Sequence, residues 1–185
     1  EYVHAPVVRA YWMEKKSISQ ETFDGINWEA VQQAYRSASL SRRTFVSKHV
    51  VGMCGVGKFM VRWKEKDTAA CPRCGEFEDA PHVWRCLGQQ ANKTWAKAVD
   101  RLAEWMQEQK TDPDVHDTIL QYLNSWRYGT SCTNVPYGLQ EVINQQQQIG
   151  WQSFLEGWLT SEWQATQNAY YNMIKSQQSG KRWTV

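Results

Sequence analysis

Four side chains that commonly bind metals lie within one short stretch of the chain. A Cys-x2-Cys pair, Cys71 and Cys74, is followed after seven residues by His82 and after three more by Cys86. Three thiolates and one imidazole form the donor set of a closed, tetrahedral structural zinc site. His82 and Cys86 would share one face of a helix, because they lie four positions apart. Since four protein donors leave no position for a water molecule, the pattern predicts a Zn2+ ion that stabilises the fold and performs no chemistry.

Other interpretations of the cysteines stay open from the sequence. A disulfide framework usually needs many paired cysteines in a short secreted chain, whereas five cysteines are spread unevenly over the 185 residues here. A thioredoxin-like redox pair would leave His82 and Cys86 unexplained. The cysteines could also be small buried apolar side chains. Cys54 and Cys132 lie outside the pattern and are expected to be free thiols, although Cys54 could serve as a spare ligand.

The positive charge of the chain is concentrated just before the zinc motif. The whole chain carries a formal net charge of only +2 at pH 7. Residues 41–66, however, hold seven Lys or Arg side chains and a single acid, Glu65. Such a patch favours binding to the phosphates of RNA or DNA, which depends on salt and is largely independent of sequence. The predicted phosphate contacts are Arg42, Arg43, Lys48, Lys58, Arg62, Lys64, Lys66 and Arg73.

Two tryptophans, Trp63 and Trp84, lie among these charges in a chain that has 11 tryptophans. Indole rings stack on the bases of single strands, so both residues are candidates for contact with nucleic acid. The alternative is that both rings brace the metal-binding segment and that the basic run is an ordinary solvated helix face. Most other tryptophans recur at helical spacing with apolar residues and are expected to form the core.

The apolar pattern predicts a mainly α-helical chain with a small Cys3His zinc knuckle inserted between helices. The predicted parts of one compact unit are an N-terminal helical and basic segment over 1–66, the zinc knuckle over 67–90 and a Trp-rich helical region over 91–185. The clearest helices are expected over 28–38 after the N-cap Asn27, over 91–110, and from the N-cap Asp112 and Pro113 to Gly129.

Other segments have weaker patterns. Residues 1–18 resemble an arm or a docking segment. Residues 41–53 are expected to form a helix, and 58–66 either a strand or a short helix. The glutamine tract 145–148 is expected to be a solvated face or a helix lead-in. Further helices are expected around 149–158 and, capped by Ser161, over 161–174.

The sequence contains no recognisable catalytic arrangement, and the chain is not expected to be an enzyme. Residues 52–58 match the G-x4-G-K pattern of a phosphate-binding loop, but Phe59 stands where a Ser or Thr hydroxyl would hold magnesium. A glycine turn is the simpler interpretation, although exposed N–H groups beside Lys58 could hold a nucleic-acid phosphate. The carboxylates form no compact two-metal cluster. The histidines outside the zinc motif are isolated in the sequence, namely His4, His49 and His116.

The sequence also bears on location. No apolar run approaches the length of a membrane span, and no signal peptide is visible. Reduced cysteines and a zinc site favour an intracellular compartment, with the nucleus as one option. Because the chain begins at Glu1 rather than Met, it could be a fragment, and a processed or truncated N-terminus leaves an organelle open.

Most of the chain from about Trp12 onward resembles a known group of sequences. Part of the likeness lies in the CPRCG, EDA and HVWRC blocks of residues 67–86. Further matching blocks are 41–43, 48–49, 52–58, 108–114, 149–157 and 179–183. Together they resemble the zinc-binding region downstream of the reverse transcriptase domain in non-LTR-type, diatom-like retroelements.

The resemblance implies that the domain binds template nucleic acid beside a polymerase, with no catalytic residue and with Cys71, Cys74, His82 and Cys86 as metal ligands. The chain itself carries no polymerase or endonuclease signature. We therefore expect a zinc-stapled nucleic-acid-binding domain derived from such a region. The rival expectation is a non-enzymatic interaction or structural subunit of a larger assembly, in which a captured fragment packs its tryptophans against partner proteins.

Overall fold

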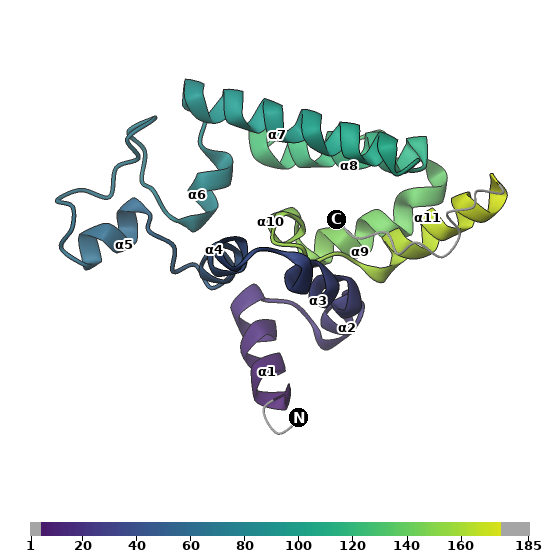
Figure 1. Cartoon of the computed structure of the whole chain (residues 1–185), viewed down its shortest axis with the longest axis horizontal. Coiled ribbons are helices and arrows are strands. Elements are labelled where there is room, and N and C mark those ends of the chain that lie inside the picture. Colours follow the sequence, from purple (N-terminus) through teal and green to yellow (C-terminus); the bar gives the residue numbers. More distant parts are fainter. Residues whose placement is uncertain (1–4, 175–185) are drawn as a thin grey trace. The chain divides into compact units, whose positions relative to one another are not determined.

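The computed structural model describes residues 5–174 and is mainly α-helical there, which confirms the predicted fold class (Figure 1). His4 and the matching block 179–183 lie outside the described residues. No β-strand occurs between residues 5 and 174, where pairing is limited to isolated bridges. The elements are α1 (Ala5–Lys16), α2 (Gln20–Asp24), α3 (Trp28–Ser37), α4 (Leu40–Val50), α5 (Gly57–Arg62), α6 (Ala80–Arg85), α7 (Gln89–Glu108), α8 (Pro113–Tyr128), the 3-10 helix η1 (Tyr137–Leu139), α9 (Gln140–Ile149), α10 (Trp151–Leu155) and α11 (Ser161–Met173).

These elements divide into two compact units that do not follow the order of the chain. Among the described residues, the first unit combines residues 5–37 with residues 136–174, and the second comprises residues 38–135. Helices α4 to α8 therefore belong to the second unit, together with the whole cysteine motif. The predicted segments 1–66 and 91–185 each contribute to both units.

The second unit is built on a hairpin of two long helices, α7 and α8 (Figure 1). Helix α8 begins as predicted, because Asp112 accepts a hydrogen bond from the N–H of Asp114 (2.8 Å) and Pro113 occupies the first turn. It ends at Gly129, whose φ of 68° is the left-handed conformation that glycine favours after a helix. The buried side chains of this pair include Met106, Val115, Ile119 and Leu123.

Two shorter helices, α4 and α5, precede the cysteine motif in the same unit. Helix α5 decides the open prediction for residues 58–66 in favour of a short helix. It is followed by Lys64 in a left-handed conformation with φ of 61°. Because so short a helix is unstable alone in water, α5 depends on its neighbours. Phe59 of α5 packs against a buried apolar cluster of Cys54, Val56 and Ala80.

The first unit contains a cluster of tryptophans. Trp158 lies edge-on to Trp12 and to Trp28, with ring centroids 5.4 and 5.2 Å apart. Trp28 also packs against Phe23 and donates its indole N–H to the Phe23 carbonyl at 2.9 Å. Edge-to-face rings at these distances are favourable. Trp12, Trp28 and Trp158 therefore form core contacts, as expected for most of the tryptophans of this chain.

Residues 5–16 form helix α1 where the weak periodicity indicated an arm or docking segment. Lys16 forms an ion pair with the buried carboxylate of Glu156. Its ammonium nitrogen also lies 5.2 Å from the ring centroid of Trp158. These contacts join α1 to residues far along the chain. A periodicity argument missed the helix because tertiary partners of this kind leave no local signal.

Helix α3 begins where it is expected, and α11 begins with a different cap. The side-chain oxygen of Asn27 accepts a hydrogen bond from the N–H of Ala30 (3.0 Å). For α11, Thr160 rather than Ser161 is the N-cap, and its hydroxyl accepts a hydrogen bond from the N–H of Glu162 (3.3 Å). Adjacent hydroxyl residues at a helix start are not distinguishable by sequence pattern.

The glutamine tract is helical, and one of its members is completely buried in α9. Oε1 of Gln146 accepts hydrogen bonds from the N–H of Thr160 (3.2 Å) and from the indole N–H of Trp163 (3.1 Å). Its Nε2 donates to the carbonyl of Trp158 (3.2 Å). The expectation of a solvated face is therefore wrong for Gln146. The sequence shows that Gln146 is polar, but it does not show that the buried polar groups of Trp158, Thr160 and Trp163 lie within reach of its side chain.

Replacing Gln146 should destabilise the protein strongly. The substitution Gln146→Ala leaves buried N–H and C=O groups unsatisfied and opens a cavity, so the free energy of unfolding should fall by about 3 kcal/mol. Gln147→Ala, at the exposed neighbouring position, should change it by less than about 0.5 kcal/mol. Urea unfolding followed by circular dichroism measures both. Equal stability of the two variants would contradict this role of Gln146.

Candidate metal centre and adjoining basic surface

The four predicted ligands converge on one point of the second unit. Their sulfur and imidazole nitrogen atoms all lie within 4.8 Å of one another. The Sγ atoms of Cys71 and Cys86 are 3.8 Å apart, and Sγ of Cys74 lies 3.3 Å from Nε2 of His82. Two sulfurs at about 2.3 Å from one tetrahedral ion would be separated by about 3.8 Å. A disulfide needs about 2.05 Å, and all these cysteines are free. The group can therefore hold a metal ion.

A tight hairpin positions the first two donors. The N–H of Cys71 donates to the carbonyl of Glu76 (2.7 Å), and the N–H of Gly75 donates to the carbonyl of Cys71 (2.8 Å). Gly75 has a φ of 82°, which lets the chain reverse directly after Cys74. The Cys-x2-Cys turn can therefore present both sulfurs to one ion.

Helix α6 positions the other two donors. Its N-cap is Asp79, whose carboxylate accepts a hydrogen bond from the N–H of His82 (2.9 Å). Pro81 stands in the first turn, where its missing N–H costs nothing. His82 thus lies at the beginning of the helix and Cys86 is its C-cap residue. The spacing of four brings both side chains to the same point, as the sequence predicts.

The donor group has unequal thiols. The pKa of Cys71 is lowered to about 7, because burial raises it but hydrogen bonds from the backbone of Arg73 and Cys74 outweigh that effect. The pKa of Cys74 is raised to about 11: a backbone hydrogen bond with Glu76 lowers it, but burial and the adjacent sulfurs of Cys86 and Cys71 prevail. Sulfurs this close repel each other as thiolates, and a cation among them would remove that repulsion.

Two glycines allow neighbouring backbone to approach the hairpin closely. A Cβ atom on Gly57 would lie 2.6 Å from the carbonyl oxygen of Ala69. A Cβ atom on Gly88 would lie 3.0 Å from the Cβ of Arg73. Gly57 therefore has no room for a side chain, whereas a side chain at Gly88 would require Arg73 to shift slightly. Both glycines connect the hairpin to the beginnings of α5 and α7.

The buried residue Glu78 ties α5 to the hairpin. Its carboxylate accepts a hydrogen bond from the N–H of Gly57 (2.8 Å), and its carbonyl accepts one from the N–H of Lys58 (2.9 Å). A negative charge at a helix N-terminus is favourable. These amides are therefore occupied by the protein itself. They are not available to cradle a phosphate, which removes the main structural support for the G-x4-G-K match.

A residue that no sequence motif marks, Arg127 of α8, is buried against α6. Its guanidinium donates hydrogen bonds to the carbonyls of Trp84 and Cys86, the latter at 2.6 Å, and to Oδ1 of Asn92 at 2.7 Å. It also lies 4.9 Å from the ring centroid of Trp95. The last carbonyls of a helix have no N–H donor within the helix, and here the Arg127 guanidinium provides the missing donors. Arg127 thus holds the backbone of the fourth donor residue.

One signal in the sequence points to Arg127. It lies four positions after Leu123 and so continues the buried stripe of α8, where a solvated charge would not be expected. Its partners are mostly backbone carbonyls, which the sequence does not identify.

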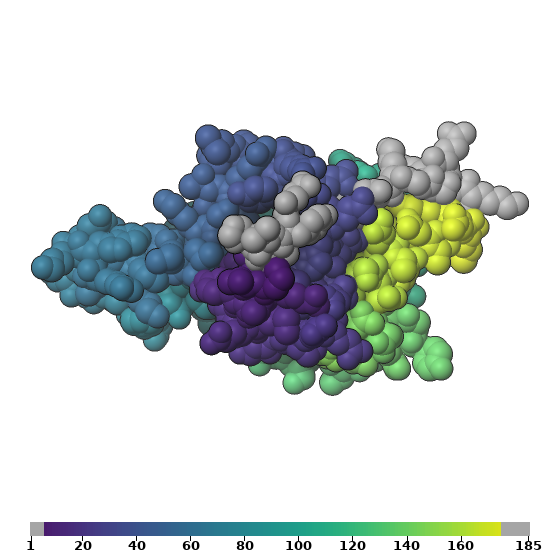
Figure 2. Space-filling view, turned by 90° about the horizontal axis from the view of Figure 1, so that it is seen from below, coloured from purple at the N-terminus to yellow at the C-terminus, as the bar shows by residue number. Residues whose placement is uncertain are grey.

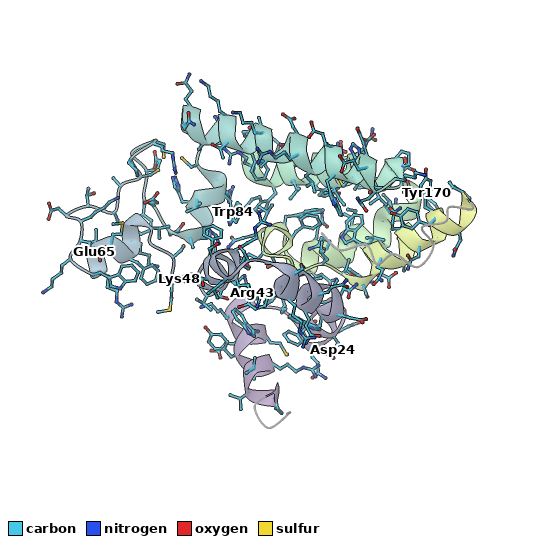
Figure 3. All side chains as sticks on the ribbon, in the orientation of Figure 1. Asp24, Arg43, Lys48, Glu65, Trp84 and Tyr170 are labelled. Carbon is cyan, nitrogen blue, oxygen red and sulfur yellow. The ribbon has the colours of Figure 1, made fainter. Side chains whose placement is uncertain are left out.

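The two tryptophans near the motif have different environments. The indole N–H of Trp84 donates to Nδ1 of His49 (3.3 Å), and their ring centroids are 4.9 Å apart. Figure 3 shows Trp84 on α6, directed toward α4. Trp84 therefore braces the unit. Trp63, in contrast, is 48% exposed and remains available for contacts.

The other two cysteines are outside the donor group. Cys54 is buried with Val56 and Ala80, and burial raises the pKa of its thiol. The Sγ of Cys132 lies 3.2 Å from Oγ of Ser125. Both are free thiols, as expected. Cys54 is not a spare ligand, because it belongs to a separate apolar cluster.

Most of the predicted phosphate contacts are exposed on α4, on α5 and next to the cysteines. The exposed members are Arg42, Lys48, Lys58, Arg62, Lys64 and Arg73. Arg43 and Lys66 are half-buried, and Nε of Arg43 donates to the carbonyl of Ala38 at 2.8 Å. The space-filling view shows the region of α5 as part of the surface (Figure 2). We call the six exposed residues the basic surface.

The close approach at Gly57 can be tested with a matched glycine. The variant Gly57→Ala forces backbone atoms apart beside the hairpin, so the free energy of unfolding should fall by about 2 kcal/mol. At Gly55 an added methyl group meets open space, and Gly55→Ala should be close to neutral. Thermal unfolding of both variants measures the difference. Identical melting temperatures would show that the segments are not packed this closely.

No α-helix within residues 5–174 combines the length and apolar character needed to cross a bilayer. Comparisons with protein-family models, curated proteins and solved structures found no match to this chain.

Proposed function

We propose that the second unit is a zinc-stapled domain that binds nucleic acid through its basic surface. The observation that carries this proposal is the position of the exposed cations on the short elements beside the four-donor group. The proposal includes descent from the reverse-transcriptase-associated region of a retroelement, for which the matching sequence blocks are the support. No group in the proposal is catalytic.

Zinc is the metal that best suits the donor set. Three thiolates and one imidazole in a closed set of four favour Zn2+ over hard ions such as Mg2+ and Ca2+, which require oxygen ligands. The separations of 3.8 Å between the Sγ atoms of Cys71 and Cys86, and of 3.3 Å between Sγ of Cys74 and Nε2 of His82, agree with tetrahedral coordination. The ion would be structural, because helices as short as α5 and α6 have little stability of their own.

Nucleic acid is the partner that best suits the surface. Lys58 and Arg62 lie four positions apart on α5 and share one face of the helix. Arg42 and Lys48 are exposed on α4, a helix that contains no acidic residue. Cations displayed in this way neutralise phosphates and release counterions. Such contacts give affinity without requiring any base sequence.

The competing function, an interaction subunit of a larger assembly, also has an observation in its favour. Helix α1 exposes Val7, Val8 and Tyr11, of which Val7 is 70% exposed. Apolar side chains grouped on one helix suit contact with a protein partner. Purified protein that ignores nucleic acid at low salt, and that is recovered from cells in a stoichiometric complex, would favour this alternative.

Metal content provides the first test. Purified protein should hold one zinc per chain by elemental analysis, and Cys86→Ser should lose the metal and unfold the knuckle, since a metal-bound thiolate is removed. Cys132→Ala should retain both zinc and fold, because Cys132 lies outside the donor group. Wild-type protein that is folded without metal and unchanged by a chelator would refute the zinc staple.

Salt dependence provides the second test. The logarithm of the affinity for nucleic acid should fall linearly with the logarithm of the salt concentration, by roughly 0.7 to 0.9 per phosphate contact. Arg62→Ala and Lys48→Ala should each reduce that slope by about 1. Lys15→Ala, an exposed position on α1, should leave the slope unchanged. Fluorescence anisotropy measures the slopes, and absence of binding at low salt with zinc present would exclude the proposed function.

A further inference from the structure

Two exposed aromatic rings lie within the basic surface. Phe45 of α4 is 50% exposed, and Trp63, directly after α5, is 48% exposed. Phe45 lies three positions from Arg42 and three from Lys48, so its ring projects between these two cations on the helix surface. The Phe45 ring is supported by the ring of His49, with centroids 5.6 Å apart, and about half of its surface stays open to solvent.

Trp63 has a similar setting on the other helix. It stands between Arg62 and Lys64, both exposed. Its ring lies 5.7 Å from the ring of Phe59, centroid to centroid, and Phe59 packs against the buried cluster of the unit. Contact with Phe59 supports the indole, while about half of its surface remains open to solvent. An anchored ring of this kind loses little freedom when a ligand stacks on it.

We propose that the basic surface binds single-stranded rather than double-stranded nucleic acid, with unpaired bases stacked on Phe45 and Trp63. This inference rests on the proposed function and specifies its ligand. The cations beside each ring would bind the phosphates on either side of a stacked base. Six residues, 51–56, join α4 to α5, which limits the distance between the facing helix ends to about 25 Å. At a rise of 1.5 Å per residue, Phe45 lies about 8 Å before the end of α4 and Trp63 about 9 Å beyond the start of α5, so the two residues are at most about 42 Å apart along this path. A strand long enough to cover that span can contact both rings.

Base stacking explains why a single strand is preferred. In a duplex the faces of the bases are covered by their neighbours, so an exposed protein ring has nothing to stack on. A duplex would use only the cations, whereas a single strand uses the cations and both rings. Because every base has a flat face, recognition of this kind is tolerant of sequence.

The direct test compares three probes that carry the same number of phosphates: oligothymidylate, oligouridylate and a hairpin duplex. Both single strands should bind more tightly than the duplex. Trp63→Ala should weaken oligothymidylate binding about tenfold or more, with little change in the salt slope, because stacking rather than charge is lost. Trp63→Phe should restore most of the affinity. Tyr137→Ala, which removes a 91% exposed ring from the first unit, should have no effect.

Lys64 allows a second test in which stability and binding change in opposite directions. Its φ of 61° is more easily adopted by glycine, so Lys64→Gly should raise the melting temperature and still weaken single-strand binding. Lys110 has the same kind of conformation, with φ of 52°, at the end of α7. Lys110→Gly should raise the melting temperature without weakening binding. A loss of affinity with Lys64→Gly cannot be attributed to misfolding.

The outcomes separate this inference from the proposed function. Equal affinity for duplex and single strands, with no effect of Trp63→Ala, would overturn the stacking inference and leave a phosphate-binding domain. If none of the three probes binds, both the stacking inference and the proposed function are wrong. Photo-crosslinking of wild-type protein with a 5-bromouracil strand tests the contact without any variant: crosslinks should map to the peptides of Phe45 or Trp63, and crosslinks found only elsewhere would refute it.

Discussion

The second unit depends on the convergence of four donor atoms from two short elements. Cys71 and Cys74 come from a tight hairpin, while His82 and Cys86 come from the beginning and end of α6. Neither element is long enough to be stable alone, and neither carries a large apolar face. Coordination would supply the free energy that such small elements cannot obtain from burial. The position of α5, and with it a large part of the basic surface, follows from the hairpin through Glu78.

Arg127 connects this centre to the helical hairpin of α7 and α8. Its guanidinium donates hydrogen bonds to the carbonyls of Trp84 and Cys86 and so fixes the backbone at the end of α6. The sulfur of Cys86 belongs to the donor group. A buried guanidinium is costly unless its N–H groups find acceptors, and here the two terminal nitrogens donate to two backbone carbonyls and to Oδ1 of Asn92. The centre is therefore supported by polar contacts behind the ligands, as metal sites generally require.

Sequence patterns were informative for features that depend on residues close together in the chain. The helical character, the start of α8 at Asp112 and the donor set were predictable, because caps, prolines and ligand spacing act over a few residues. Helix α1, the burial of Gln146 and the role of Arg127 were not predictable, because their partners are distant in the chain. The same limit applied to Trp84 and Trp63, which have similar sequence surroundings and different exposure.

The sequence by itself determined the fold class, the four donors and the concentration of positive charge before them. These properties follow from residue type and spacing, which persist in any conformation of the chain. Only the tertiary structure decided that the amides of α5 bind Glu78, that Trp84 contacts His49, and that Trp63 stays exposed. The physical reason is that burial and hydrogen-bond satisfaction belong to pairs of residues far apart in sequence, and folding alone brings those pairs together.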